Sequence, residues 1–147
     1  MGARSRIVES LVLKLKEIDG TGAYKSNLSS NVLNKMVFYD EISDFPTVCV
    51  VAGYESREYL PSAFTWGYLN ISLKIYVEDE NSQQLLENVL SDIEYVVSNN
   101  EKLTYDSGAG EQTADILITS IQTDEGVLAP LGVGEINITA RYQLISP

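Results

Sequence analysis

The chain has 147 residues, of which 44% are hydrophobic and 21% charged, so it is long enough for one domain with a real core and has the composition of a globular protein. Ten Lys and Arg against 21 Asp and Glu give a net charge of −11, which argues against a protein that grips nucleic-acid phosphates or docks on anionic membranes. The absence of His removes the usual general base and the commonest metal ligand, and the single Cys excludes an internal disulfide and a Cys-based zinc site.

Residues 5–18 predict an amphipathic helix. Apolar side chains recur at Ile7, Leu11, Leu15 and Ile18, the spacing that places them on one side of a helix. Gly20 is a natural stop, and residues 19–31 are rich in Gly, Ser, Thr and Asn, which indicates a loop.

The next segments predict short strands. Residues 32–38 favour a modest strand, followed by a polar corner at residues 39–45. Residues 47–51 are nearly all β-branched or apolar, which predicts a central strand covered on both faces, with Cys49 as a buried small hydrophobe rather than a reactive thiol. Residues 54–64 are expected to form a polar loop.

Residues 65–78 give the clearest strand, because apolar and other side chains alternate strictly. The apolar side holds Leu69, Ile71, Leu73, Ile75 and Val77, and the opposite side holds Trp66, Tyr68, Asn70, Ser72, Lys74 and Tyr76. This pattern predicts a sheet with one face on the core, and an opposite face that carries aromatic residues.

A second helix is expected between Asn81 and Asn99, with a capping box formed by Asn81 and Gln84 and an apolar stripe along its length. A Gly-rich loop follows, then a strand at residues 114–123, a Gly/Pro loop at 124–134 and a last alternating strand at 135–144. This order predicts a single domain over residues 1–147 of the α+β class, a mostly antiparallel β-sheet with two amphipathic helices packed on one face. The strand order stays open.

No catalytic set emerges from these residues. Asp106-Ser107-Gly108 matches the short signature of aspartic proteases, but their chemistry needs two such carboxylates and one copy is present, so a Gly-rich turn is favoured. The acids at residues 78–80 lack the spacing of a calcium loop. We expect no enzyme activity, no metal and no cofactor.

The layout resembles the phage tail terminator family. The features that carry the resemblance are the N-terminal amphipathic helix, Phe45-Pro46 before a Val-rich strand, the long alternating strand that meets a Leu-rich helix, the segment at residues 124–132 and a final strand that closes on Arg141-Tyr142. The resemblance spans residues 5–144. It implies a virion structural protein, assembled in the host cytoplasm and located at the head-proximal end of the tail.

The resemblance implies further that copies form a ring, commonly a hexamer, which caps the tail tube, stops its polymerisation and joins the tail to the head. The implied partners are other copies of the chain, the tail tube protein, the head–tail connector or neck protein and, in a contractile tail, the sheath; DNA passes through the lumen without specific binding, and no membrane is involved. The alternatives are a neck or head-completion protein of the same fold and a soluble adaptor outside any virus.

Subunit-interface candidates follow from residue type and expected exposure. They lie on the aromatic side of the long strand and in the loops at 54–64, 102–112 and 124–134: Trp66, Tyr68, Tyr76, Tyr59, Tyr105, Leu128 and Leu131. The aromatic row has two explanations, an interface or cross-strand pairing on an exposed sheet. The negative charge also has two explanations: it lines a lumen that repels DNA phosphates, or it serves ordinary solubility.

Overall fold

A computed structural model describes residues 2–28 and 30–144. The elements in chain order are helix α1 (Ala3–Leu15), β1 (Val32–Leu33), a 3-10 helix η1 (Tyr39–Glu41), β2 (Thr47–Leu60), β3 (Phe64–Glu78), α2 (Ser82–Ser98), β4 (Thr104–Asp106), β5 (Glu111–Gln112), β6 (Asp115–Thr123) and β7 (Leu131–Leu144).

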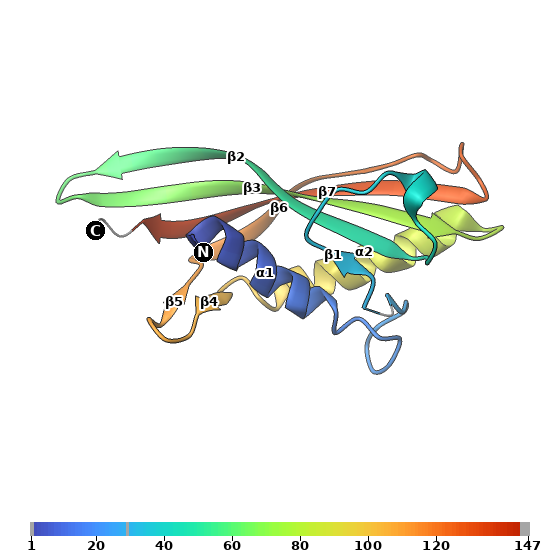
Figure 1. Cartoon of the computed structure of the whole chain (residues 1–147), viewed down its shortest axis with the longest axis horizontal. Coiled ribbons are helices and arrows are strands. Elements are labelled where there is room, and N and C mark those ends of the chain that lie inside the picture. Colours follow the sequence, from blue (N-terminus) through green and yellow to red (C-terminus); the bar gives the residue numbers. More distant parts are fainter. Residues whose placement is uncertain (1, 29, 145–147) are drawn as a thin grey trace.

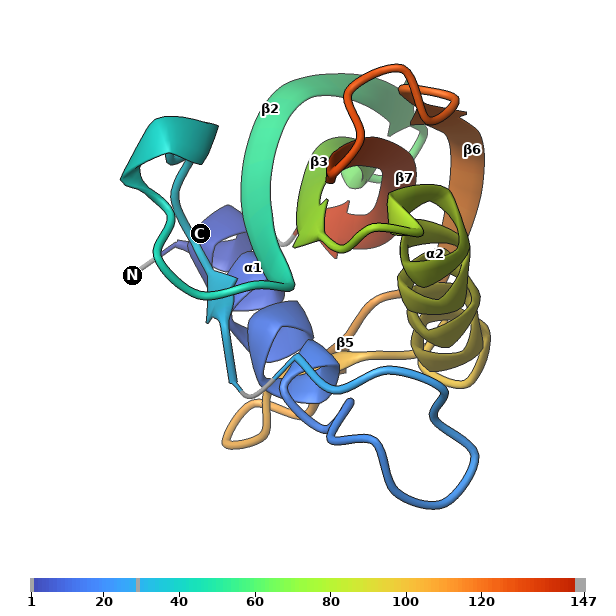
Figure 2. The same ribbon diagram turned by 90° about the vertical axis from the view of Figure 1, so that its right-hand side faces the viewer.

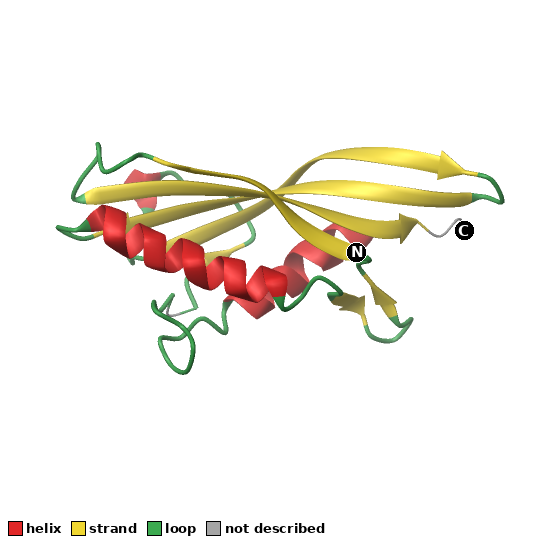
Figure 3. Cartoon of the chain, turned by 180° about the vertical axis from the view of Figure 1, so that it is seen from behind, coloured by secondary structure: helices red, strands yellow, loops and turns green. Residues whose placement is uncertain are grey.

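The main sheet has the strand order β1-β2-β3-β7-β6. Its pairs are antiparallel except for the short parallel pairing of β1 with β2, and β4 and β5 form a separate small hairpin. Figures 1 and 3 show both helices beneath one face of this sheet, and Figure 2 shows α1 on the side of β1 and β2 and α2 on the side of β6. The predicted α+β fold with two helices on one face is confirmed.

Alternation along β3 and β7 builds the core. Every second residue of β3 from Leu69 to Val77 is at most 1% exposed, and the paired residues of β7 from Ile136 to Tyr142 are equally buried. The buried stripes of α1 and α2 cover this face, as the 3.6-residue period of the sequence predicts.

Two expectations about helix ends are corrected. Helix α1 ends at Leu15, and residues 17 and 18 continue in tighter turns whose N–H groups bond three residues back, so Ile18 is buried beyond the helix. The expected capping box is absent, because Asn81 makes no side-chain cap and its N–H donates at 2.8 Å to the carboxylate of Asp79.

The strand expectations were wrong in two places. Residues 54–60 are not a loop, since β2 continues to Leu60 and pairs with β3 as far as Phe64. The strand expected at residues 32–38 is limited to Val32–Leu33. The prediction for residues 47–51 is confirmed in position, because this part of β2 lies between β1 and β3 and residues 47–50, with Cys49 among them, are buried.

A buried carboxylate ties α2 to the loop after α1. Asp92 is 2% exposed and accepts the backbone N–H groups of Lys25 and Ser26 and the hydroxyl of Ser26, at 2.6–3.0 Å. These bonds give a buried polar side chain its required partners and fix a segment that has no regular structure of its own.

Gly67 allows the ring of Tyr142 to cross β3. A Cβ at this position would stand 2.7 Å from Cε1 of Tyr142. The ring has little freedom to move, because it is 1% exposed, lies edge-on to Tyr105 and donates its hydroxyl to Glu55 at 2.8 Å.

We therefore expect Gly67→Ala to lower the free energy of unfolding by about 2 kcal/mol, the usual effect of overpacking. Gly53→Ala is the matched control, because a Cβ at Gly53 meets nothing within 4 Å. Chemical denaturation of both variants measures the difference, and equal midpoints would contradict the overpacking argument.

Candidate interaction surfaces

The outer part of the β2–β3 hairpin extends past the helices, and we call residues 54–68 the arm. Figure 1 shows it reaching beyond the N-terminal end of α1. Tyr54 and Tyr59 are each 73% exposed, and Leu60 is 40% exposed. The arm therefore presents large apolar side chains that the chain itself does not cover.

Trp66 lies on the open face of the arm, opposite Glu58, half-buried among neighbours that orient its ring. The edge of Phe64 meets it with the ring centroids 4.9 Å apart, and the guanidinium carbon of Arg141 lies 4.4 Å from its ring centroid. Arg141 is held in turn by a 2.9 Å ion pair with Asp115. These contacts position the ring and leave its side chain little conformational entropy to lose.

Charges in the arm are satisfied within the chain. Arg57 bonds to Glu55 at 2.9 Å, and the carboxylate of Glu58 accepts the hydroxyl of Tyr68 at 3.0 Å. That hydrogen bond is the main reason why the pKa of Tyr68 is raised above its ordinary value. The exposed surface of the arm therefore combines aromatic and apolar side chains with charged groups that already have a bond within the chain.

The middle of the open face is a row of small polar side chains bonded across the strands. Asn70 accepts from Thr139 at 2.9 Å, Ser72 donates to Asn137 at 3.0 Å, and Asn137 donates to Ser120 at 3.0 Å. This face therefore has a paired polar ladder in its middle and aromatic side chains toward the arm.

Tyr76 and Tyr105 are buried in the chain. Tyr76 is 7% and Tyr105 8% exposed, and burial raises the pKa of both phenols. Tyr105 packs edge-on against Tyr142. Most of the surface of each ring therefore packs inside the chain, and little of it is exposed.

Leu128 and Leu131 lie at the opposite end of the molecule from the arm, in and after the turn between β6 and β7. Leu128 is 48% exposed, and its neighbour Val127, which the sequence did not single out, is 81% exposed. The carboxylate of Asp124 holds this turn by accepting the N–H groups of Leu128 at 3.0 Å and Val133 at 2.9 Å. Burial alone would raise the pKa of Asp124, but these backbone bonds lower it below its ordinary value.

The same end of the molecule is strongly acidic. Figures 1 and 2 place η1, the β3–α2 turn and the β6–β7 turn together there. The acids of these three segments are Asp40, Glu41, Asp44, Glu78, Asp79, Glu80, Asp124 and Glu125. The two ends of the folded molecule thus differ in chemistry: the arm is aromatic and the opposite end is acidic.

The protease-like motif lies in the small β4–β5 hairpin. Asp106 forms an ion pair with Arg6 and accepts the N–H of Ala109 at 3.1 Å, so its carboxylate closes a turn and anchors α1. Among residues 2–28 and 30–144, no three His, Cys, Asp or Glu side chains come together in a way that holds a metal ion. No helix within the described part of the chain is long and apolar enough to cross a membrane.

Both the sequence and the fold of this chain match known proteins. A family model described as bacteriophage tail tube terminator protein matches residues 1–146. The tail tube terminator protein p142 of Escherichia phage T5 is 35% identical over 97% of this chain and 95% of its own length. A chain in the virion of a native gene transfer agent particle superposes with a TM-score of 0.59 over 97% of this chain and 95% of its own, at 8% identity, which shows a shared fold.

Proposed function

Because this chain belongs to the bacteriophage tail tube terminator family and is a structural component of the virion tail, we propose that its copies form a ring that caps the head-proximal end of the tail tube. The ring, a hexamer in this proposal, stops tube polymerisation and then offers a surface to the head connector. The observation that carries the proposal is the family match, which spans nearly the whole chain.

A ring requires two different patches on each copy, which meet head to tail until the rotation closes. The sheet supports this requirement, since β6 is an edge strand on one side and β2 beyond its pairing with β1 is an edge on the other. The two sides carry different helices, α1 and α2 (Figure 2). Each copy therefore has unlike lateral surfaces.

The two ends of the molecule suit the joining of two different partners. We assign the aromatic arm, with Trp66, Tyr68 and Tyr59, to protein contacts, and the acidic end to a position where carboxylates repel DNA phosphate. In this arrangement DNA crosses the ring without specific binding. Leu128 and Leu131 lie near the acidic end and would contact the neighbouring ring or connector.

The direct test adds purified protein to polymerising tail tubes. We expect tube length, measured by negative-stain electron microscopy, to become limited as the protein is added, with a ring on one end of each tube. Bovine serum albumin at the same concentration is the control for crowding. Unchanged growth would reject the terminator role, and binding to the connector without an effect on tubes would favour the neck role.

A further inference from the structure

An acidic groove separates α2 from the edge strand β6. Its volume is about 570 Å³, and its lining is Glu87, Leu90, Ser91, Glu94, Ile121, Gln122, Thr123 and Glu125. Leu90 and Ile121 give it an apolar floor, and Ile121 is 38% exposed. The groove therefore combines three carboxylates with uncovered apolar surface.

The two elements that line this groove contain no positively charged side chain. Residues 82–101 contain no Lys or Arg, and neither does β6. Among the ion pairs of the described residues, none involves Glu87, Glu94 or Glu125. A cationic side chain brought into the groove would gain attraction to all three.

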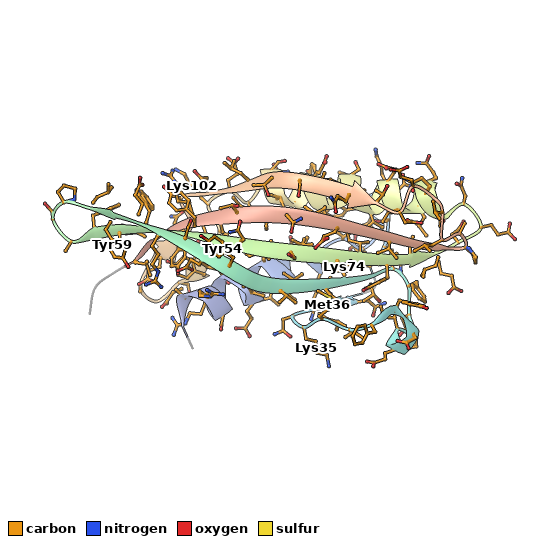
Figure 4. All side chains as sticks on the ribbon, turned by 90° about the horizontal axis from the view of Figure 1, so that it is seen from above. Lys35, Met36, Tyr54, Tyr59, Lys74 and Lys102 are labelled. Carbon is orange, nitrogen blue, oxygen red and sulfur yellow. The ribbon has the colours of Figure 1, made fainter. Side chains whose placement is uncertain are left out.

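The opposite side of the molecule carries a segment with complementary chemistry. Met36 is 49% and Phe38 73% exposed, and Lys35 beside them is exposed and forms no ion pair in the described part of the chain. Figure 4 shows Lys35 and Met36 projecting from one long side, with α2 and β6 on the other. Figure 2 agrees, since the chain around β1 and η1 lies across the molecule from α2.

We propose that residues 35–38 of one copy occupy the α2–β6 groove of the next copy and form the lateral contact of the ring. The Lys35 ammonium then lies among the carboxylates, while Met36 and Phe38 cover the exposed part of Ile121. Each copy donates one segment and accepts one, which is the head-to-tail contact that a closed ring needs. This inference rests on the proposed ring.

The acids of η1 limit how the segment enters. Asp40 and Glu41 follow Lys35 within six residues, and the groove repels them. The contact therefore has a defined register, with Lys35 inside the groove and η1 outside it.

Charge reversal tests the contact. Lys35→Glu places a fourth carboxylate in the groove, and Glu87→Lys/Glu94→Lys gives the groove a net positive charge opposite Lys35, so we expect each change to raise the protein concentration for half-maximal assembly by about tenfold or more. The combined variant Lys35→Glu/Glu87→Lys/Glu94→Lys restores opposite charges across the contact and is expected to assemble within about threefold of the wild type. Lys16→Glu, which changes an exposed lysine after α1 that lines neither the groove nor the hollow beside Trp66, is the control for net charge.

Native mass spectrometry reads the assembly in solution, and counts of capped tubes by electron microscopy read it where assembly needs the tube. Wild-type-like assembly by both Lys35→Glu and Glu87→Lys/Glu94→Lys, or no recovery by the combined variant, would overturn this contact while leaving the ring intact. A wild-type protein that forms no ring either in solution or on tubes would instead reject the proposed function.

Discussion

Replacing Asp92 by Ala is expected to lower the free energy of unfolding by about 3 kcal/mol, the order expected when several buried donors lose their acceptor. The carboxylate receives two backbone N–H groups and one hydroxyl from residues 25 and 26, and it is 2% exposed. The variant leaves the buried N–H and hydroxyl of Ser26 and the partly buried N–H of Lys25 without this acceptor. Chemical denaturation followed by circular dichroism measures the loss.

Two controls separate this bonding role from a general effect of changing α2. Glu94→Ala removes an exposed acid from the same helix and is expected to change stability by less than about 0.5 kcal/mol. Asp92→Asn keeps the side-chain volume and one acceptor oxygen, so its loss of unfolding free energy should fall between those of Asp92→Ala and Glu94→Ala. Equal stability of Asp92→Ala and Glu94→Ala would show that the three bonds contribute little.

The strands that bury one face against the helices could be predicted from the sequence. In β3 and β7 the alternation of apolar and polar residues has a period of two, which fixes both the strand and its facing. The β2 half of the arm could not be predicted, because residues 57–60 are exposed on both faces and show no alternation, whereas residues 65–68 belong to the strand expected at 65–78. Only its pairing with β3, a contact with another part of the chain, makes residues 54–60 a strand.

The candidate interaction residues divide along similar lines. Residue type identified Trp66, Tyr68 and Tyr59, which the structure gathers in or beside the arm, but residue type cannot say whether a Tyr such as Tyr76 is covered. That depends on what packs over it.

Some residues that matter were missed altogether. Asp92 carried a usable signal, an acid within the apolar stripe of a helix, three residues after Val89. The acidic groove gave no signal in the sequence, because its carboxylates come from two separate segments, α2 and the turn after β6.

Trp66→Ala is expected to weaken capping of tail tubes about 30-fold or more while costing the fold only about 1 kcal/mol. The first effect is that of losing an interface Trp, since such side chains are frequent hot spots. The second is the loss of the ring contacts with Phe64 and Arg141. This prediction assumes that the arm faces a protein partner.

Tyr95→Ala is the matched control, because Tyr95 is an exposed aromatic residue on α2 that also makes one edge-on ring contact, with Tyr24 at 5.8 Å. Titration of each variant against tubes of known end concentration gives the capping affinity, and denaturation gives the stability. If both variants cap equally well, the surface around Trp66 does not contact the tube. If Trp66→Ala loses stability and capping in proportion, Trp66 acts by supporting the sheet, because a contact residue weakens binding far more than it weakens the subunit.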